Sequence, residues 1–184
     1  TRNLILKARQ LGMSTFSVLF LLNECILNPN YSAGIVSYSL EHAQHIFKKI
    51  IGHALDNLHP EFATTVQIMQ RSAREIVFAN GSTLRVDTSL RGGSYQLVLV
   101  SEFGKTCARS PMKSEEIITG TLQTVSPSGK IIIESTGEGQ EGYFAEMVLQ
   151  ASQRGNDNLT PLDYKLFFFP WFDDASYQQQ QKSY

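Results

Sequence analysis

The stretch KARQLGMST, residues 7–15, joins two apolar runs and contains two cations, one glycine and two hydroxyl residues. A phosphate-binding loop of the Walker A pattern, G-x-x-x-x-G-K-[ST], stands at such a place between a strand and a helix. When the two are aligned on Gly12 and Ser14, Met13 replaces the usual lysine and Lys7 falls on the first glycine. The loop therefore predicts a phosphate site whose cation has moved from its end to its beginning.

Bound phosphate needs inward-pointing backbone N–H groups, a helix N-terminus, a cation and a hydroxyl group for Mg²⁺. Lys7 and Arg9 supply positive charge, and Ser14 supplies the hydroxyl. We expect the nucleotide-binding residues to be Lys7, Ala8, Arg9, Gln10, Leu11, Gly12, Met13, Ser14 and Thr15. The alternative is an ordinary helix start, in which Ser14 and Thr15 cap the helix and Lys7 is solvated.

A second candidate is LVLVSEFGK, in which an apolar run ends in Ser101 and Glu102. In ATPases that use water as the nucleophile, such a strand ends in two acids. The first holds Mg²⁺, and the second orients the attacking water. Glu102 occupies the second position, whereas Ser101 offers the metal's water shell a hydroxyl without a charge.

A third candidate is the triplet Ser135, Thr136 and Gly137, which follows the apolar run KIIIE. Small hydroxyls at the end of a strand can sense whether a γ-phosphate is present and pass that state to the next element. The alternative is a glycine-rich turn in which the two hydroxyls satisfy local backbone groups.

The elements that must position these residues alternate between short β-rich runs and longer helical ones. The patterns predict strands at 3–8, 32–39, 95–102, 129–136 and 164–172, helices at 14–28, 41–58, 114–125 and 142–153, and a β-hairpin at 74–88 around Asn80 and Gly81. Such an order predicts an α/β fold with a mainly parallel sheet and helices on both faces. Ligands of these sheets bind beyond the carboxyl ends of the strands, which selects the loops 7–15, 101–111 and 135–142.

Composition limits the remaining possibilities. A chain of 184 residues with 42% hydrophobic residues is long enough for one domain with a full core, and a formal net charge of −1 argues against a uniformly basic DNA binder. Cys25 and Cys107 lie far apart without metal-ligand spacing, so we interpret both as buried thiols in a reducing compartment. The apolar run near the start is too short for a membrane span.

Two features invite a functional interpretation that we do not adopt. The histidines at 42, 45, 53 and 59 have no cysteine or carboxylate cluster beside them, so we interpret them as solvated surface residues rather than metal ligands. The aromatic run LFFFPWF could stack on bases, but a buried strand explains it more simply.

Together KARQLGMST, VLVSEFGK and IIIESTGEG, in this order, resemble the large terminase subunit of tailed bacteriophages, the motor that pumps DNA into the capsid. The resemblance covers most of the chain and implies a P-loop NTPase of the additional-strand, catalytic-glutamate type. It implies ATP and Mg²⁺ as cofactors and gives Glu102 the role of catalytic glutamate, Arg9 that of the loop arginine, and Ser135 to Gly137 that of the coupling motif. Arg91 falls where the family places an arginine that reaches into a neighbouring subunit's site.

The same resemblance implies the setting of the protein. The expected partners are double-stranded DNA, the portal protein and the small terminase subunit, with the chain monomeric alone and in a homo-oligomeric ring on the portal. The expected location is the cytoplasm of the bacterial host, at the procapsid portal, with no membrane contact.

The resemblance also divides the chain into parts. Residues 1–172 would form the ATPase domain, and 173–184 would form a polar tail or the start of a linker to a nuclease domain. We expect the chain to be a piece of a longer protein. The family's adenine-binding segment lies upstream of the first strand and would be absent from this piece.

Two departures from the family pattern leave alternatives open. Met13 removes the usual lysine and Ser101 the usual aspartate, which weakens the expected grip on Mg-ATP. We expect an ATP hydrolase that is weak as an isolated domain. The alternatives are a helicase-like DNA translocase, or a degenerate module that binds nucleotide or DNA without hydrolysis.

Overall fold

The computed structural model describes residues 1–174 and 177, and most of the predicted polar tail lies outside these residues. The strands are β1 (Arg2–Lys7), β2 (Ser32–Ser37), β3 (Ile68–Arg71), β4 (Glu75–Phe78), β5 (Thr83–Asp87), β6 (Tyr95–Ser101), β7 (Val125–Ser135) and β8 (Tyr164–Phe169). The helices are α1 (Met13–Leu27), α2 (Leu40–His45), the π-helix η1 (Ile46–Gly52), α3 (His53–Asp56), α4 (Pro60–Ala63), α5 (Phe103–Arg109), α6 (Pro111–Thr119), the 3₁₀ helix η2 (Thr121–Thr124), α7 (Tyr143–Arg154) and the 3₁₀ helix η3 (Trp171–Asp173).

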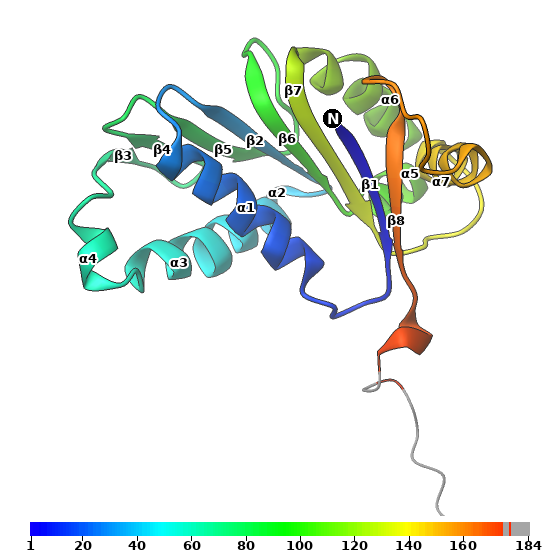
Figure 1. Cartoon of the computed structure of the whole chain (residues 1–184), viewed down its shortest axis with the longest axis horizontal. Helices are drawn as coiled ribbons and strands as arrows, with labels where there is room; N and C mark the ends of the chain where they lie inside the picture. Colours follow the sequence, from blue (N-terminus) through cyan, green and yellow to red (C-terminus); the bar gives the residue numbers. More distant parts are fainter. Residues whose placement is uncertain (175–176, 178–184) are drawn as a thin grey trace, which may run out of the picture.

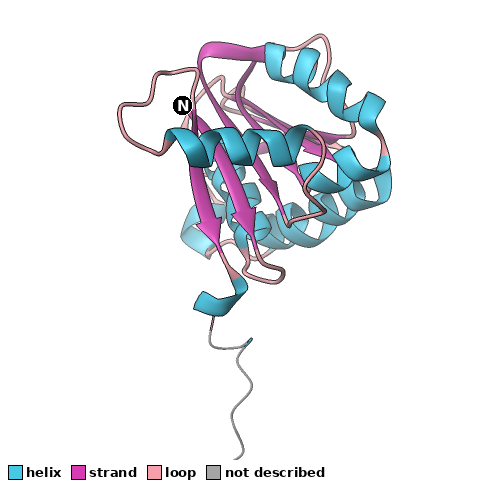
Figure 2. Ribbon diagram, turned by 90° about the vertical axis from the view of Figure 1, so that its right-hand side faces the viewer, coloured by secondary structure: helices cyan, strands magenta, loops and turns pink. Residues whose placement is uncertain are grey.

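Within these residues one eight-stranded sheet has the order β3-β4-β5-β2-β6-β7-β1-β8. The six strands β5, β2, β6, β7, β1 and β8 are parallel to one another. In Figure 2 the arrowheads of the nearest strands point toward the same edge of the sheet. Strand β7 lies between β1, which ends at Lys7, and β6, which ends at Ser101. This is the additional-strand arrangement, and the predicted fold class is confirmed.

Helices cover both faces of the sheet because its central strands are apolar on both sides. Helix α1 and the α2–η1–α3 segment lie on one face, and α5, α6 and α7 lie on the other (Figure 1). Helix α1 buries Val18, Leu21, Leu22 and Cys25, which recur at the helical spacing of three to four residues. On the opposite face the rings of Phe103 and Phe144 meet edge to face, with centroids 6.4 Å apart.

The hairpin predicted around Asn80 and Gly81 is confirmed as the antiparallel pair β4 and β5. Gly81 has φ of 83°, a conformation that glycine adopts without a steric penalty. The Asn80 side chain donates to the carbonyls of Cys25 and Ile26, at 3.0 and 3.2 Å, and so satisfies the end of α1. Strand β3 was not predicted, and its four residues are all exposed at the edge of the sheet.

Three predictions about helical segments were wrong, and one of them is the helix expected at 114–125, which the structure divides into α6 and η2. The segment 41–58 is divided into α2, η1 and α3 instead of forming one α-helix. Ile46, Phe47, Ile51 and Gly52 are buried in η1, and their spacing of five matches the i→i+5 geometry of a π-helix. The turn expected at 101–111 contains α5, because Phe103 and Cys107 lie one turn apart and both pack into the core.

The prediction of a buried strand at 164–172 was also wrong. Strand β8 ends at Phe169 and lies at the edge of the sheet, with β1 as its neighbour. Phe168 is 56% exposed, and Trp171 and Phe172 of η3 are exposed after Pro170. An edge strand has a neighbouring strand on one side only, so its side chains are less buried than those of the central strand β6.

Both cysteines are buried, as predicted, and burial raises the pKa of the Cys25 thiol to about 12. His45, His53 and His59 are exposed, but His42 is half-buried, with Nδ1 2.7 Å from Ser37 Oγ. Burial lowers the pKa of His42 below its usual value. No helix among the described residues has the length and apolarity needed to cross a bilayer.

Candidate nucleotide-binding site

The loop from Lys7 to Gly12 crosses from the end of β1 to the start of α1. Gly12 is the N-cap residue of α1 with φ of 73°, and no side chain caps the helix. The alternative of an ordinary capped helix start was therefore wrong. Ser14 Oγ instead donates a hydrogen bond to Glu134 Oε2 at 3.1 Å. The first N–H groups of α1 remain available to an anion.

A cleft of about 570 Å³ and another of about 550 Å³ lie near this edge, and the smaller one contains the loop. It is lined by Lys7, Arg9, Gln10, Leu11, Gly12, Met13, Ser14, Thr15, Glu102, Lys105 and Thr136. Except for Ala8, every predicted nucleotide-binding residue lines it. The loop and the turns after β6 and β7 thus meet at one cleft, as expected for the carboxyl ends of parallel strands.

Lys7 is buried at the base of this cleft between two carboxylates. Its Nζ lies 3.2 Å from Glu102 Oε1 and 3.7 Å from Glu134 Oε2. Because 95 positions separate Lys7 from Glu102, only the sheet brings them together. A desolvated ammonium group in this position is a strong electrostatic partner for phosphate oxygens.

Glu102 follows β6 and is the N-cap residue of α5, with φ of 55° and ψ of 45°. A non-glycine residue in this left-handed conformation is strained, and such strain gathers at functional sites. Lys105 Nζ lies 3.0 Å from Glu102 Oε2. Burial raises the pKa of Glu102, but Lys7 and Lys105 outweigh burial and hold the pKa below its usual value. The carboxyl group is therefore ionised at neutral pH.

Glu134 was not predicted as a site residue, yet its side chain lies among those of Lys7, Ser14 and Ser101. It is fully buried at the end of β7. Ser101 Oγ donates to its Oε1 at 2.8 Å, and Ser14 Oγ donates to its Oε2. Burial raises the pKa of Glu134 above its usual value, although its polar partners oppose the shift. The sequence feature that could have indicated Glu134 is a carboxylate directly after three consecutive isoleucines, Ile131 to Ile133.

The triplet that follows β7 lies beside the element that carries Glu102. Ser135 Oγ accepts the backbone N–H of Gly104 in α5 at 3.0 Å. Thr136 lines the cleft, and its Oγ1 donates to Glu138 at 3.3 Å, whereas Gly137 is exposed. Gly104 was not predicted; a Cβ at this position would lie 2.8 Å from Ser135 Oγ. The end of β7 and the start of α5 are thus in close contact.

The two predicted arginines lie in different places. Arg9 is exposed and lines the cleft. Arg91 is exposed and pairs with Glu116 of α6, Nη2 to Oε1 at 2.8 Å, and it does not line the cleft. Helix α6 lies toward the opposite edge of the sheet from the loop that joins β1 to α1 (Figure 1). The structure therefore does not bring Arg91 to the site of its own chain.

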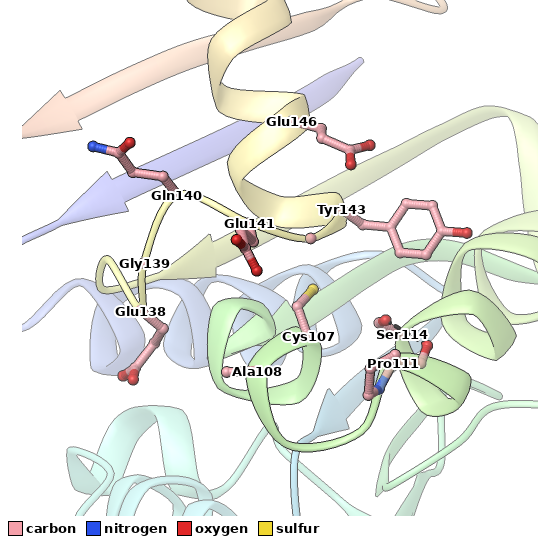
Figure 3. Close-up of a pocket in the computed structure, with 11 residues that line it drawn as sticks. Cys107, Ala108, Pro111, Ser114, Glu138, Gly139, Gln140, Glu141, Tyr143 and Glu146 are labelled. Carbon is pink, nitrogen blue, oxygen red and sulfur yellow. Dashed lines mark hydrogen bonds between the residues drawn. The ribbon is translucent and has the colours of Figure 1, made fainter.

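The larger cleft lies between α5 and the turn that leads into α7. Figure 3 shows Cys107 and Ala108 on α5, Glu138 and Glu141 on the turn, and Glu146 on α7. No lysine or arginine lines it. Three carboxylates without a cation repel phosphate, so the candidate site is the smaller cleft.

The oxygen donors beside Lys7 fit Mg²⁺, which prefers carboxylates, hydroxyls, water and phosphate oxygens. They are the Ser14 hydroxyl and the carboxylates of Glu102 and Glu134, with the Ser101 hydroxyl behind them. No group of three or more His, Cys, Asp or Glu side chains among the described residues is arranged to hold a metal by itself. A magnesium ion here would depend on nucleotide phosphates for its remaining ligands.

Comparison with known proteins connects this geometry to solved structures. No protein-family model and no curated protein matches the sequence. The ATPase domain of the large terminase of Thermus phage P74-26 is 16% identical, with a TM-score of 0.59 over 92% of this chain and 74% of that chain. An arginine-to-alanine variant of the same domain is 17% identical, with a TM-score of 0.66 over 92% and 75%.

The large terminase of bacteriophage HK97 is 16% identical, with a TM-score of 0.68 over 92% of this chain and 35% of that chain. All three likenesses span nearly the whole chain at low identity, so they concern the arrangement of the sheet and helices. This chain shares the fold of the solved ATPase domains of phage large terminases.

Proposed function

We propose that this chain is the ATPase domain of a phage or prophage large terminase, which hydrolyses ATP to move double-stranded DNA into a capsid. The observation that carries the proposal is the convergence of Lys7, Ser14 and Glu102 at one cleft beyond the carboxyl ends of the parallel strands. The shared fold of solved terminase ATPase domains adds support.

In the proposed mechanism the loop amides and Lys7 bind the phosphates of ATP. In the structure Lys7 is held by Glu102 and Glu134. An entering γ-phosphate competes for the ammonium group, so Lys7 turns toward phosphate and the Glu102 carboxylate loses its partner. Nucleotide binding thereby frees the catalytic carboxylate.

Glu102 then accepts a hydrogen bond from the attacking water and takes its proton as the water oxygen bonds to the γ-phosphorus. The bond between the γ-phosphorus and the bridging oxygen breaks, and ADP and phosphate leave. Arg9, at the rim of the cleft, or an Arg91 from a neighbouring subunit stabilises the charge of the transition state. Bound Mg²⁺ would neutralise phosphate charge, held through Ser14 with Ser101 behind it.

The site also explains the expected weakness of an isolated domain. Arg91 is remote from its own cleft, so a ring of subunits on the portal would supply it from the neighbour. The proposed partners are therefore double-stranded DNA, the portal protein, the small terminase subunit and further copies of the chain. The proposed location is the procapsid portal in the bacterial cytoplasm.

The test is titration of the protein with a fluorescent ATP analogue, followed by phosphate release with and without portal and DNA. We expect binding in the micromolar range or tighter, with turnover that rises on assembly. Absence of binding would refute the proposal. Binding without turnover in the assembled complex would favour the non-hydrolysing module, and turnover that responds to DNA but not to portal would favour a helicase-like translocase.

A further inference from the structure

The contacts of Glu134 suggest a role that the proposed function does not yet include. Its side chain is fully buried, yet each of its polar partners belongs to the proposed nucleotide site. These partners are Ser101 Oγ at 2.8 Å, Ser14 Oγ at 3.1 Å and Lys7 Nζ at 3.7 Å. Burial of a carboxylate destabilises the fold unless polar partners offset the lost hydration. An ion pair with Lys7 alone does not explain two serine hydroxyls directed at the same group.

The strand order explains why Glu134 reaches this position. Strand β7 lies between β1 and β6, and its register places Glu134 beside Ile5 on one side and Ser101 on the other. The carboxylate of Glu134 therefore occupies the space next to Ser101, one strand closer to the loop. An acid at position 101 would direct its charge into the same space.

The charges around the cleft distinguish Glu134 from the other polar residues of the site. Glu102 is held by Lys7 and Lys105, so its charge is already matched by two cations. Ser14, the proposed hydroxyl ligand, and Ser101 are neutral. Glu134 is thus the carboxylate that stands directly against the Ser14 hydroxyl. Mg²⁺ in nucleotide sites is held by one or two carboxylates together with phosphates and water.

We propose that Glu134 supplies the negative charge of the Mg²⁺ site that Ser101 lacks, either directly or through a metal-bound water. This inference rests on the proposed function and deepens it. It predicts that a mutation of Glu134 weakens the contribution of Mg²⁺ to nucleotide binding more than it weakens binding of the metal-free nucleotide.

The experiment measures the Kd of a non-hydrolysable ATP analogue with Mg²⁺ and with EDTA, and Mn²⁺ binding to the nucleotide complex by electron paramagnetic resonance. Loss of a group that contacts a bound metal only through its ligands costs roughly 10- to 100-fold in metal affinity. We therefore expect Glu134→Gln to lower Mn²⁺ affinity by roughly that factor while the Kd in EDTA changes by less than about threefold. Glu141→Gln, an exposed glutamate, is the matched control.

The double variant Ser101→Asp with Glu134→Gln returns a carboxylate to the same space from β6. We expect it to recover Mn²⁺ binding, and it decides the question if Glu134→Gln alone does not fold, as judged by circular dichroism. A Glu134→Gln protein that behaves like the control would overturn the inference, as would a folded double variant without recovery. Equal losses with and without metal would mean that Glu134 only positions Lys7. Failure of the unmodified protein to bind nucleotide would instead refute the proposed function.

Discussion

At the scale of single residues, the balance of charge at the base of the cleft depends on Lys7. This lysine stands at the end of β1 and is buried between the carboxylates of Glu102 and Glu134. Met13, which occupies the usual lysine position, packs partly buried against the core below α1. The two residues therefore have different surroundings, although both lie in the stretch that joins β1 to α1.

A comparison of Lys7→Ala with Met13→Ala tests this division. Lys7→Ala removes the only cation beside the buried Glu134 carboxylate in the described residues, so we expect ATP turnover to be abolished and unfolding free energy to fall by about 3–5 kcal/mol. Met13→Ala should cost little turnover. The measurements are phosphate release by the assembled motor and urea denaturation. Equal, small losses of turnover in both variants would contradict the displaced-lysine hypothesis.

Glu102→Gln separates catalysis from nucleotide binding. Glutamine preserves the shape of the side chain but accepts a proton from water poorly, so hydrolysis should be lost. The change also weakens the hold of position 102 on Lys7, so nucleotide affinity should stay the same or increase. Calorimetric titration and single-turnover hydrolysis check the two halves. Loss of nucleotide binding at unchanged folding would assign Glu102 a metal or structural role.

At the scale of elements, the junction between β7 and α5 connects the nucleotide cleft to the helical layer. Ser135 at the end of β7 accepts the Gly104 N–H in the first turn of α5, two residues after Glu102. Thr136, which lines the cleft, is therefore one residue away from a direct contact with the helix that begins after Glu102. This contact is a physical route for the proposed coupling between hydrolysis and movement.

Gly104→Ala tests the close packing of this junction. The new Cβ would lie 2.8 Å from Ser135 Oγ and 3.1 Å from the Thr136 carbonyl oxygen. Overpacking of this kind costs about 1–3 kcal/mol, and it should also displace Glu102 and lower turnover. Gly137→Ala is the control, because nothing lies within 4 Å of its added Cβ. Thermal denaturation should distinguish the two, and equal stability of both variants would show that the junction adapts without strain.

At the scale of the whole molecule, the position of Arg91 relates this chain to an assembly. Arg91 pairs with Glu116 on α6 and lies outside the cleft. An arginine that completes a phosphoryl-transfer site contributes on the order of 10³ to 10⁵ in rate. If Arg91 acts, it acts on a neighbour, and its ion pair with Glu116 must open for that purpose.

Mixed rings test this arrangement. Arg91→Ala and Glu102→Gln each remove a different half of an intersubunit site, so each variant alone should be inactive. A mixture should regain part of the ATPase activity, because some interfaces combine an intact Glu102 with an intact Arg91. Portal-stimulated phosphate release measures the recovery. No recovery in rings shown to be mixed would mean that Arg91 does not act across subunits.

Local pattern alone determined much of this protein. Periodicity predicted the parallel strands and α1, and the Asn80-Gly81 pair predicted the hairpin. Each of these features depends on residues that are close in sequence, or on the preference of apolar runs for a buried sheet. The place of Gly12 at the start of α1 follows from the same local rules.

Only the tertiary structure decided which charges meet. Glu134 read as the end of an apolar strand, but the register of β7 between β1 and β6 placed it against Ser14, Ser101 and Lys7. Likewise, Phe168 is exposed because β8 lies at the edge of the sheet. The segment expected to be a turn after Ser101 contains helix α5, which packs into the core through Phe103. Strand order and register are set by contacts far apart in the chain, so no local pattern contains them.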